Sequence, residues 1–164
     1  MNFDFKYKLL GYGWAKVYLQ FENKKIQIDA SYFNNPPFEL LNGINNIISK
    51  KANSSDVIFI CEPGEYKLTL TKLNDREILL KLFLADEWIS FNFIDENGNE
   101  VNKNINYVFI TETIIYIASF AKLIFSNMQN ILKSYGEKGY KEKWDERYSF
   151  PRKEYRKLKK YLKI

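Results

Sequence analysis

Three stretches near the start of the chain alternate apolar and polar residues with a period of two. Phe3, Phe5, Tyr7 and Leu9 alternate with charged residues, and the same pattern returns over 15–21 and 26–32. Successive side chains of a strand point to opposite faces, so this spacing predicts strands with one buried and one solvated face. Strands of this kind are typical of antiparallel sheets, which need other elements to cover only one face.

The period changes to that of a helix over residues 36–50. Asn35 is suited to cap this helix, and the two prolines that follow it are suited to its first turn. Gly43 lies inside the helix and costs it about 1 kcal/mol relative to alanine. Close packing against a strand is one explanation for this glycine. The apolar residues that form one face of the helix are Phe38, Leu40, Leu41, Ile44, Ile47 and Ile48.

Further alternating or apolar runs and turn signals follow this helix. Asn74-Asp75 and Asn97-Gly98 have the composition of tight turns. The strands predicted from these patterns cover residues 56–61, 65–73, 76–84, 87–94 and 105–110.

The last third of the chain is predicted to be helical. Thr111 or Thr113 is suited to cap a long, mostly buried helix, and Gly136 is suited to end it. Ser149 and Pro151 mark the start of a last helix. We therefore expect a single α+β domain over 1–164, with two layers: a mostly antiparallel sheet and helices packed on it. Residues 1–112 are mainly strands with a helix near 36–50, and residues 113–164 are helical with a basic end.

Composition excludes several classes of site. The chain of 164 residues has no histidine and a single cysteine, Cys61. It therefore lacks the commonest general base, and it has no set of thiols or imidazoles to hold a transition metal. We expect no cofactor, no metal and no enzymatic activity, although an enzyme of unfamiliar type stays open. A buried, inert thiol is the expected state of Cys61.

The first residues of the chain and its longest apolar run indicate where in the cell the protein is expected. The first residues do not have the basic start and apolar stretch of a signal peptide. The longest apolar run contains Lys122 and is too short for a membrane span. The abundance of Lys, Asn and Ile is typical of an AT-rich bacterial genome. We therefore expect a cytoplasmic bacterial protein. An uncovered sheet edge is a possible site of pairing between two copies.

Positive charge is concentrated at the C-terminal end. Residues 133–164 hold twelve Lys and Arg against five Asp and Glu, while the whole chain has a net charge of +5. A basic helix with aromatic residues near it can follow phosphates and stack on bases. It can equally dock its narrow apolar side on the domain and be solvated elsewhere. The candidate residues for nucleic-acid binding are Trp144, Tyr148, Arg152, Arg156, Lys157 and Lys160.

The stretch FICEPGEYKLTL places two carboxylates, Glu62 and Glu65, on either side of Pro63-Gly64. A Pro-Gly pair favours a type II turn, so the segment reads as a hairpin corner or a bend with both carboxylates facing solvent. An acid–base pair would also require a pocket between them. We expect an acidic contact for a protein partner, formed with a second acidic group. The candidate residues are Glu62, Glu65, Asp86, Glu87 and Trp88.

Two motifs resemble a family of small bacterial proteins with no assigned activity. In that family a DASY strand end leads into a helix with a double leucine, and an EPGEY element follows about thirty residues later. The resemblance covers residues 26–84. The matching residues are Asp29, Ala30, Ser31, Tyr32, Leu40, Leu41, Glu62, Pro63, Gly64, Glu65 and Tyr66.

Proteins of this size and style are similar to immunity proteins of bacterial toxin systems. The resemblance therefore implies a non-enzymatic protein-binding module that occludes a toxin domain. Interfaces of this kind use aromatic residues and arginine as anchors and charge for steering. The alternative function is nucleic-acid binding by the basic C-terminal segment.

Overall fold

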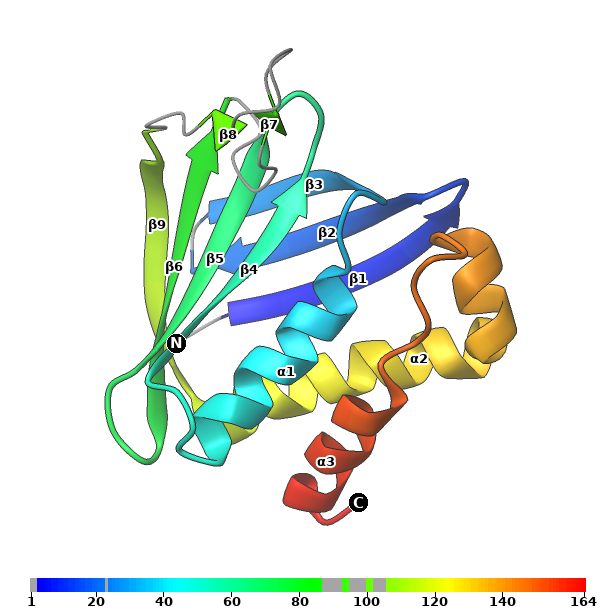
Figure 1. Ribbon diagram of the computed structural model, residues 1–164. Helices are drawn as coiled ribbons and strands as arrows, with labels where there is room; N and C mark the ends of the chain where they lie inside the picture. Colours follow the sequence, from blue (N-terminus) through cyan, green and yellow to red (C-terminus); the bar gives the residue numbers. More distant parts are fainter. Residues whose placement is uncertain (1–2, 23, 87–92, 95–99, 102–105) are drawn as a thin grey trace.

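The protein was analysed as a computed structural model, which describes residues 3–22, 24–86, 93–94, 100–101 and 106–164. Figure 1 shows the strands on one side of the molecule and the helices on the other. The fold is α+β, as the sequence predicts. The predicted strand over 87–94 and the turn at 97–98 lie largely outside the described residues, and Glu87 and Trp88 lie outside them entirely.

The first sheet has three antiparallel strands in the order β1-β2-β3. They are β1 (Phe3–Gly11), β2 (Trp14–Phe21) and β3 (Lys24–Ser31). The alternation in the sequence matches their two faces: Phe5, Tyr7 and Leu9 are buried, while Lys6 and Lys8 between them are exposed. The period-two prediction is confirmed.

The second sheet has four antiparallel strands in the order β4-β5-β6-β9. They are β4 (Ser54–Ile60), β5 (Glu65–Lys72), β6 (Glu77–Ala85) and β9 (Val108–Tyr116). Thr111 and Thr113 pair with Leu82 and Leu80 of β6, so the prediction that either threonine caps a helix is wrong. A two-residue pair joins β7 (Phe93–Ile94) to β8 (Glu100–Val101).

The helix α1 (Pro36–Ile48) begins as the sequence predicts. Asn35 is its N-cap residue, and the side chain of Asn35 accepts a hydrogen bond from Phe38 N. The structure explains why residue 43 is a glycine, because a Cβ atom there would lie 2.6 Å from Ser55 Oγ. The glycine therefore allows α1 to pack closely on β4.

The long helix α2 (Ile117–Lys143) has non-helical backbone at Gly136, with a φ of 66°. Its ψ is −175°, and glycine adopts this region of positive φ without the strain that a side chain would cause. The sequence correctly places a break at this residue, but helical turns resume after it and continue to Lys143. The last helix is α3 (Arg152–Leu162), and Pro151 is its N-cap residue.

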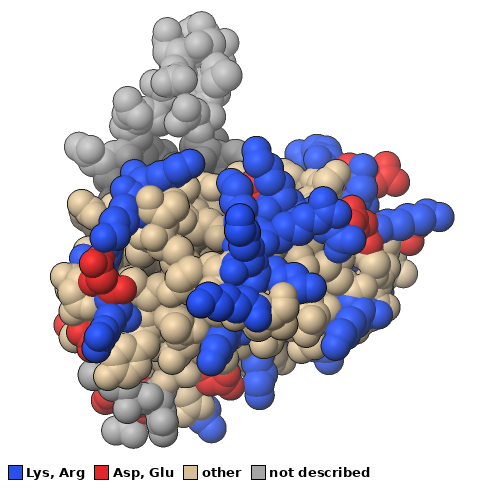
Figure 2. All heavy atoms as spheres, turned by 90° about the horizontal axis from the view of Figure 1, so that it is seen from below, with Lys and Arg blue, Asp and Glu red and all other residues tan. Residues whose placement is uncertain are grey.

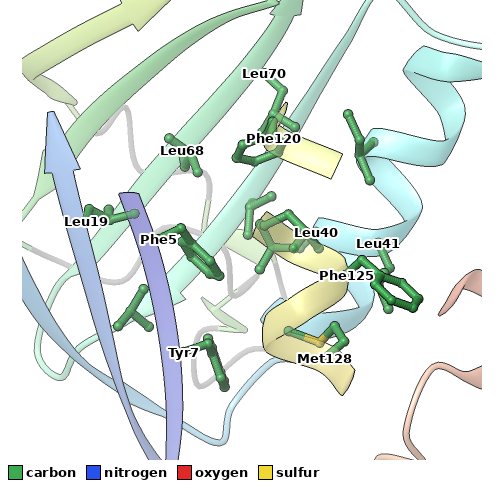
Figure 3. Packing of buried hydrophobic residues seen from close by; sticks show 14 of the residues in the cluster. Phe5, Tyr7, Leu19, Leu40, Leu41, Leu68, Leu70, Phe120, Phe125 and Met128 are labelled. Atoms are coloured by element: carbon green, nitrogen blue, oxygen red, sulfur yellow. The ribbon is translucent and has the colours of Figure 1, made fainter. Parts of the chain in front are cut away.

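The core lies between the two sheets and the three helices. Figure 3 shows Phe5 and Leu19 of the first sheet near Leu68 and Leu70 of the second, with Phe120 of α2 against them. All five side chains are almost completely buried. The same cluster of buried side chains extends to Tyr155 and Leu158 of α3. Among the described residues, no helix has the length and apolar composition needed to cross a membrane.

Candidate functional site

The helix α3 is attached to the core by a narrow apolar side. The ring of Tyr155 stacks on Phe125 of α2, with 4.9 Å between the ring centroids. Leu158 is completely buried, and Asn45 of α1 donates a hydrogen bond from Nδ2 to Glu154 O at 2.9 Å. These contacts fix the orientation of α3, so the residues on its other sides point to solvent.

Those other sides are almost uniformly basic. Arg152 makes an ion pair with Glu137 of α2, with 3.1 Å between Nε and Oε1, and it is the only α3 side chain in an ion pair within the part of the chain that the structure describes. Figure 2 shows lysine and arginine side chains gathered over this face of the molecule, with few carboxylates among them. The exposed cations of this basic face are Arg152, Lys153, Arg156, Lys157, Lys159, Lys160 and Lys163.

Four of the six predicted nucleic-acid-binding residues lie on this basic face: Arg152, Arg156, Lys157 and Lys160. Trp144 and Tyr148 do not. Trp144 is 2% exposed, and its Nε1 donates a hydrogen bond to Asn34 O at 3.1 Å. The prediction that this ring stacks on bases is therefore wrong for the folded protein.

Tyr148 is half-buried and serves a structural role similar to that of Trp144. Its hydroxyl donates a hydrogen bond to Phe33 O at 3.0 Å. The guanidinium of Arg147 lies over the same ring, 5.5 Å from the ring centroid. Both aromatic residues attach the segment between α2 and α3 to the end of β3, which is the reason that neither projects with the basic face.

The residues of the predicted acidic site differ in their exposure in the structure. The segment 61–64 closes the hairpin between β4 and β5, with a hydrogen bond from Cys61 N to Gly64 O at 2.9 Å. The Glu62–Pro63 peptide bond is cis, and the hairpin corner predicted for this segment is confirmed. Glu62 is exposed, as expected.

Glu65 is completely buried, which corrects the prediction that it faces solvent. Its Oε1 accepts a short hydrogen bond from the hydroxyl of Tyr107. A carboxylate of a hairpin corner can be buried in this way because a partner from a distant segment satisfies it. Asp86 is exposed, and it lies beside the corner: a Cβ atom at Gly64 would meet backbone atoms of Ala85 and Asp86.

Two exposed apolar residues lie at the same end of the second sheet as Asp86. Val108 is 60% exposed and Phe109 is 51% exposed, and they pair with Leu84 and Phe83 at the end of β6. This exposed pair was not predicted from the sequence, because a strand residue with an apolar side chain is normally assigned to the core. The end of the sheet thus combines exposed carboxylates with exposed apolar surface.

A half-buried carboxylate, Glu39, was also not predicted. Its Oε1 accepts a hydrogen bond from Asn34 Nδ2 at 2.9 Å, and its Oε2 accepts one from Ile58 N at 2.7 Å. Burial raises the pKa of Glu39 above its ordinary value, which the two hydrogen bonds partly offset. One oxygen joins α1 to β4 and the other holds Asn34, which precedes α1, so both oxygens have a structural role.

Cys61 is half-buried, and burial raises the pKa of its thiol, with a smaller contribution from the charge of Glu65. The reactive thiolate is therefore disfavoured. Within the described ranges, no three carboxylate or thiol side chains gather in a group that could hold a metal ion. No family model, no curated protein and no solved structure matches this chain.

Proposed function

We propose that this chain is a nucleic-acid-binding protein that contacts phosphates through the basic face of α3. The observation that carries the proposal is the exposure of all seven cations of residues 152–163, on a helix whose apolar side is buried in the core. The eleven residues of α3 extend over about 16 Å at 1.5 Å per residue. A rigid row of cations of this length can follow several consecutive phosphates.

The docking of α3 favours a polyanion in solution over a membrane surface. An amphipathic helix that binds at a bilayer inserts its apolar face between lipid headgroups. In α3 that face is formed by Tyr155 and Leu158, which pack against the core. The exposed surface of α3 therefore offers charge and hydrogen-bond donors, which are the groups that phosphates require.

The test is binding of fluorescein-labelled oligonucleotides, followed by fluorescence anisotropy at several salt concentrations. The triple variant Arg156→Gln, Lys157→Gln, Lys160→Gln removes three charges from the basic face. Its affinity should fall, and the slope of log K against log salt should become shallower by about 2 to 3, since each phosphate contact contributes about 0.7 to 0.9.

The matched control removes the same charge from the outer face of the first sheet. Lys6, Lys8 and Lys25 are all exposed, and their replacement by glutamine leaves α3 unchanged. We expect this triple variant to bind as the unmodified protein does. Equal losses in the two triple variants, or no binding by the unmodified protein, would contradict the proposal.

The acidic end of the second sheet supports a second candidate function, a protein-binding module of the immunity type. The specific observation is the combination of exposed Glu62 and Asp86 with exposed Val108 and Phe109. Interfaces commonly surround an apolar centre with charged residues. A toxin domain with a basic surface is the partner that this arrangement fits.

The second candidate is tested with the purified product of the gene next to this one in the source genome. Co-elution in size-exclusion chromatography is expected for the unmodified protein and should be lost in the double variant Glu62→Lys, Asp86→Lys. The variant Glu146→Lys, at another exposed carboxylate, is the control and should co-elute. Absence of a complex with the unmodified protein, or co-elution of the double variant, counts against this function.

A further inference from the structure

Tyr12 is the most exposed aromatic side chain in the described part of the protein. It stands at the tip of the hairpin between β1 and β2, where it is 98% exposed. Its φ of 55° lies in the left-handed region, which an aromatic residue seldom adopts. Asparagine or glycine would suit this turn at lower cost. An exposed aromatic residue in a costly conformation suggests a role in binding.

The hairpin tip is held in place by the end of α2. Gly13 N donates a hydrogen bond to Lys143 O at 3.0 Å. The ring of Tyr32 packs so closely on Gly13 that a Cβ atom there would lie within 2.6 Å of it. Figure 1 shows the tip of this hairpin beside the last turns of α2. Tyr12 is therefore presented from a fixed backbone, which lowers the entropy cost of a contact.

The same turns of α2 connect the tip to the basic face of α3. Arg152 at the start of α3 is paired with Glu137, and Lys143 contacts the hairpin six residues later. Six helical residues span about 9 Å. Exposed Lys138 and half-buried Lys141 lie along this segment, where Lys138 makes an ion pair with Glu142. Lysine side chains, with Glu137 and Glu142 between them, thus extend from α3 to the turn of α2 that holds the hairpin of Tyr12.

We propose that Tyr12 stacks on a base of a single-stranded nucleic acid whose phosphates follow the basic face of α3 and the end of α2. The inference rests on the proposed function and specifies its substrate class. Bases of a single strand offer their faces to an aromatic ring, whereas those of a duplex are already stacked. Trp144 and Tyr148 are engaged in the fold, and Tyr161 of α3 is 41% exposed, whereas Tyr12 is 98% exposed and so offers the most ring surface for stacking.

The test compares a thymidine homopolymer with a duplex of equal strand length, again by anisotropy. Tyr12→Ala should weaken binding of the single strand by about 5- to 150-fold, which corresponds to the loss of one stacked base. Affinity for the duplex and the slope of the salt dependence should not change. Tyr12→Phe keeps the ring and should bind as the unmodified protein does.

Two further variants make the result specific to the ring at this position. Tyr12→Asn removes the ring but suits the left-handed backbone, so it separates loss of stacking from any disturbance of the turn. Tyr116→Ala removes a ring that is 60% exposed at the end of β9, and it should have no effect.

The outcomes distinguish the inference from the proposed function. If the triple variant of α3 loses affinity but Tyr12→Ala and Tyr12→Asn do not, the role of Tyr12 is overturned and phosphate binding by α3 stands. An equal loss for single strand and duplex in the Tyr12 variants also overturns stacking. If the unmodified protein binds neither probe, both the inference and the proposed function are overturned.

Discussion

Asn127 of α2 binds the backbone of β1 at Tyr7 in the way that a neighbouring strand would. Its Oδ1 accepts a hydrogen bond from Tyr7 N at 2.8 Å, and its Nδ2 donates one to Phe5 O at 2.9 Å. Strand edges offer unpaired backbone groups that can pair with another chain. At β1 one amide side chain satisfies two of these groups, so this stretch is not an uncovered edge at which two copies could pair.

We expect Asn127→Ala to lower the free energy of unfolding by about 1 to 3 kcal/mol, because it leaves two backbone groups of β1 without partners. Urea denaturation followed by circular dichroism measures the change. Asn130→Ala is the control, since Asn130 is exposed on the same helix, and it should stay within about 0.5 kcal/mol of the unmodified protein. Equal stability of the two variants would show that the amide does not support the edge.

A second prediction concerns Gly43 and Ser55. Gly43→Ala would improve the intrinsic helix propensity of α1 by about 1 kcal/mol. The added Cβ atom would meet Ser55 Oγ at 2.6 Å and Ser55 Cβ at 3.1 Å, so overpacking should outweigh this gain and destabilise the protein by about 1 to 3 kcal/mol.

The double variant Gly43→Ala, Ser55→Ala removes the closer of these two contacts. It should recover part of the lost stability, and a double-mutant cycle in urea gives the coupling between the two positions. Additive effects of the two substitutions would mean that the contact between α1 and β4 does not explain the glycine.

Features that depend on neighbouring residues could be read from the sequence. Asn35 and Pro36 set the start of α1, and the alternation around Tyr7 sets the faces of β1, because each signal lies within one element. Thr113 was misassigned because its pairing with Leu80 comes from a strand 33 residues away. The division of the strands into two sheets depends on such distant pairing as well.

In the candidate site, too, the features that depend on residues distant in the sequence could not be predicted. The cations of α3 are exposed as predicted, because charge on a short amphipathic helix determines which sides face water. The burial of Glu65 depends on Tyr107, which is 42 residues away, and that of Trp144 depends on Asn34, which is 110 residues away. Tyr12 was not identified, because its importance comes from exposure and from contact of its hairpin with α2.

A third prediction concerns the pH dependence of stability through Glu39. Burial raises the pKa of this carboxyl above 4.5 in the folded protein. The folded state therefore holds the proton more tightly than the unfolded state does. This contribution to stability is present below pH 4.5 and is lost as the pH rises through the folded pKa.

Glu39→Gln removes this titration and keeps an oxygen that can accept the hydrogen bond from Ile58 N. Measured by urea denaturation from pH 4 to 7, the variant should gain stability relative to the unmodified protein as the pH rises above 4.5. Glu146→Gln, at an exposed carboxylate, is the control, and its free energy of unfolding should depend on pH as that of the unmodified protein does. If the free energy of unfolding of Glu39→Gln also follows the pH dependence of the unmodified protein, the pKa of Glu39 is the same in the folded and unfolded states.

The last prediction concerns the hydroxyl of Tyr107, which donates its hydrogen bond to buried Glu65. Tyr107→Phe removes this donor and keeps the ring that Lys67 Nζ approaches to 3.6 Å from the centroid. A buried carboxylate that loses a donor is costly, so we expect a loss of about 1 to 3 kcal/mol in the free energy of unfolding. Tyr66→Phe is the control, because the hydroxyl of Tyr66 has no hydrogen bond to any other residue that the structure describes. If the two variants are equally stable in urea, Tyr107 does not hold Glu65 in place, and Glu65 would then have to be reconsidered as a contact residue of the acidic end.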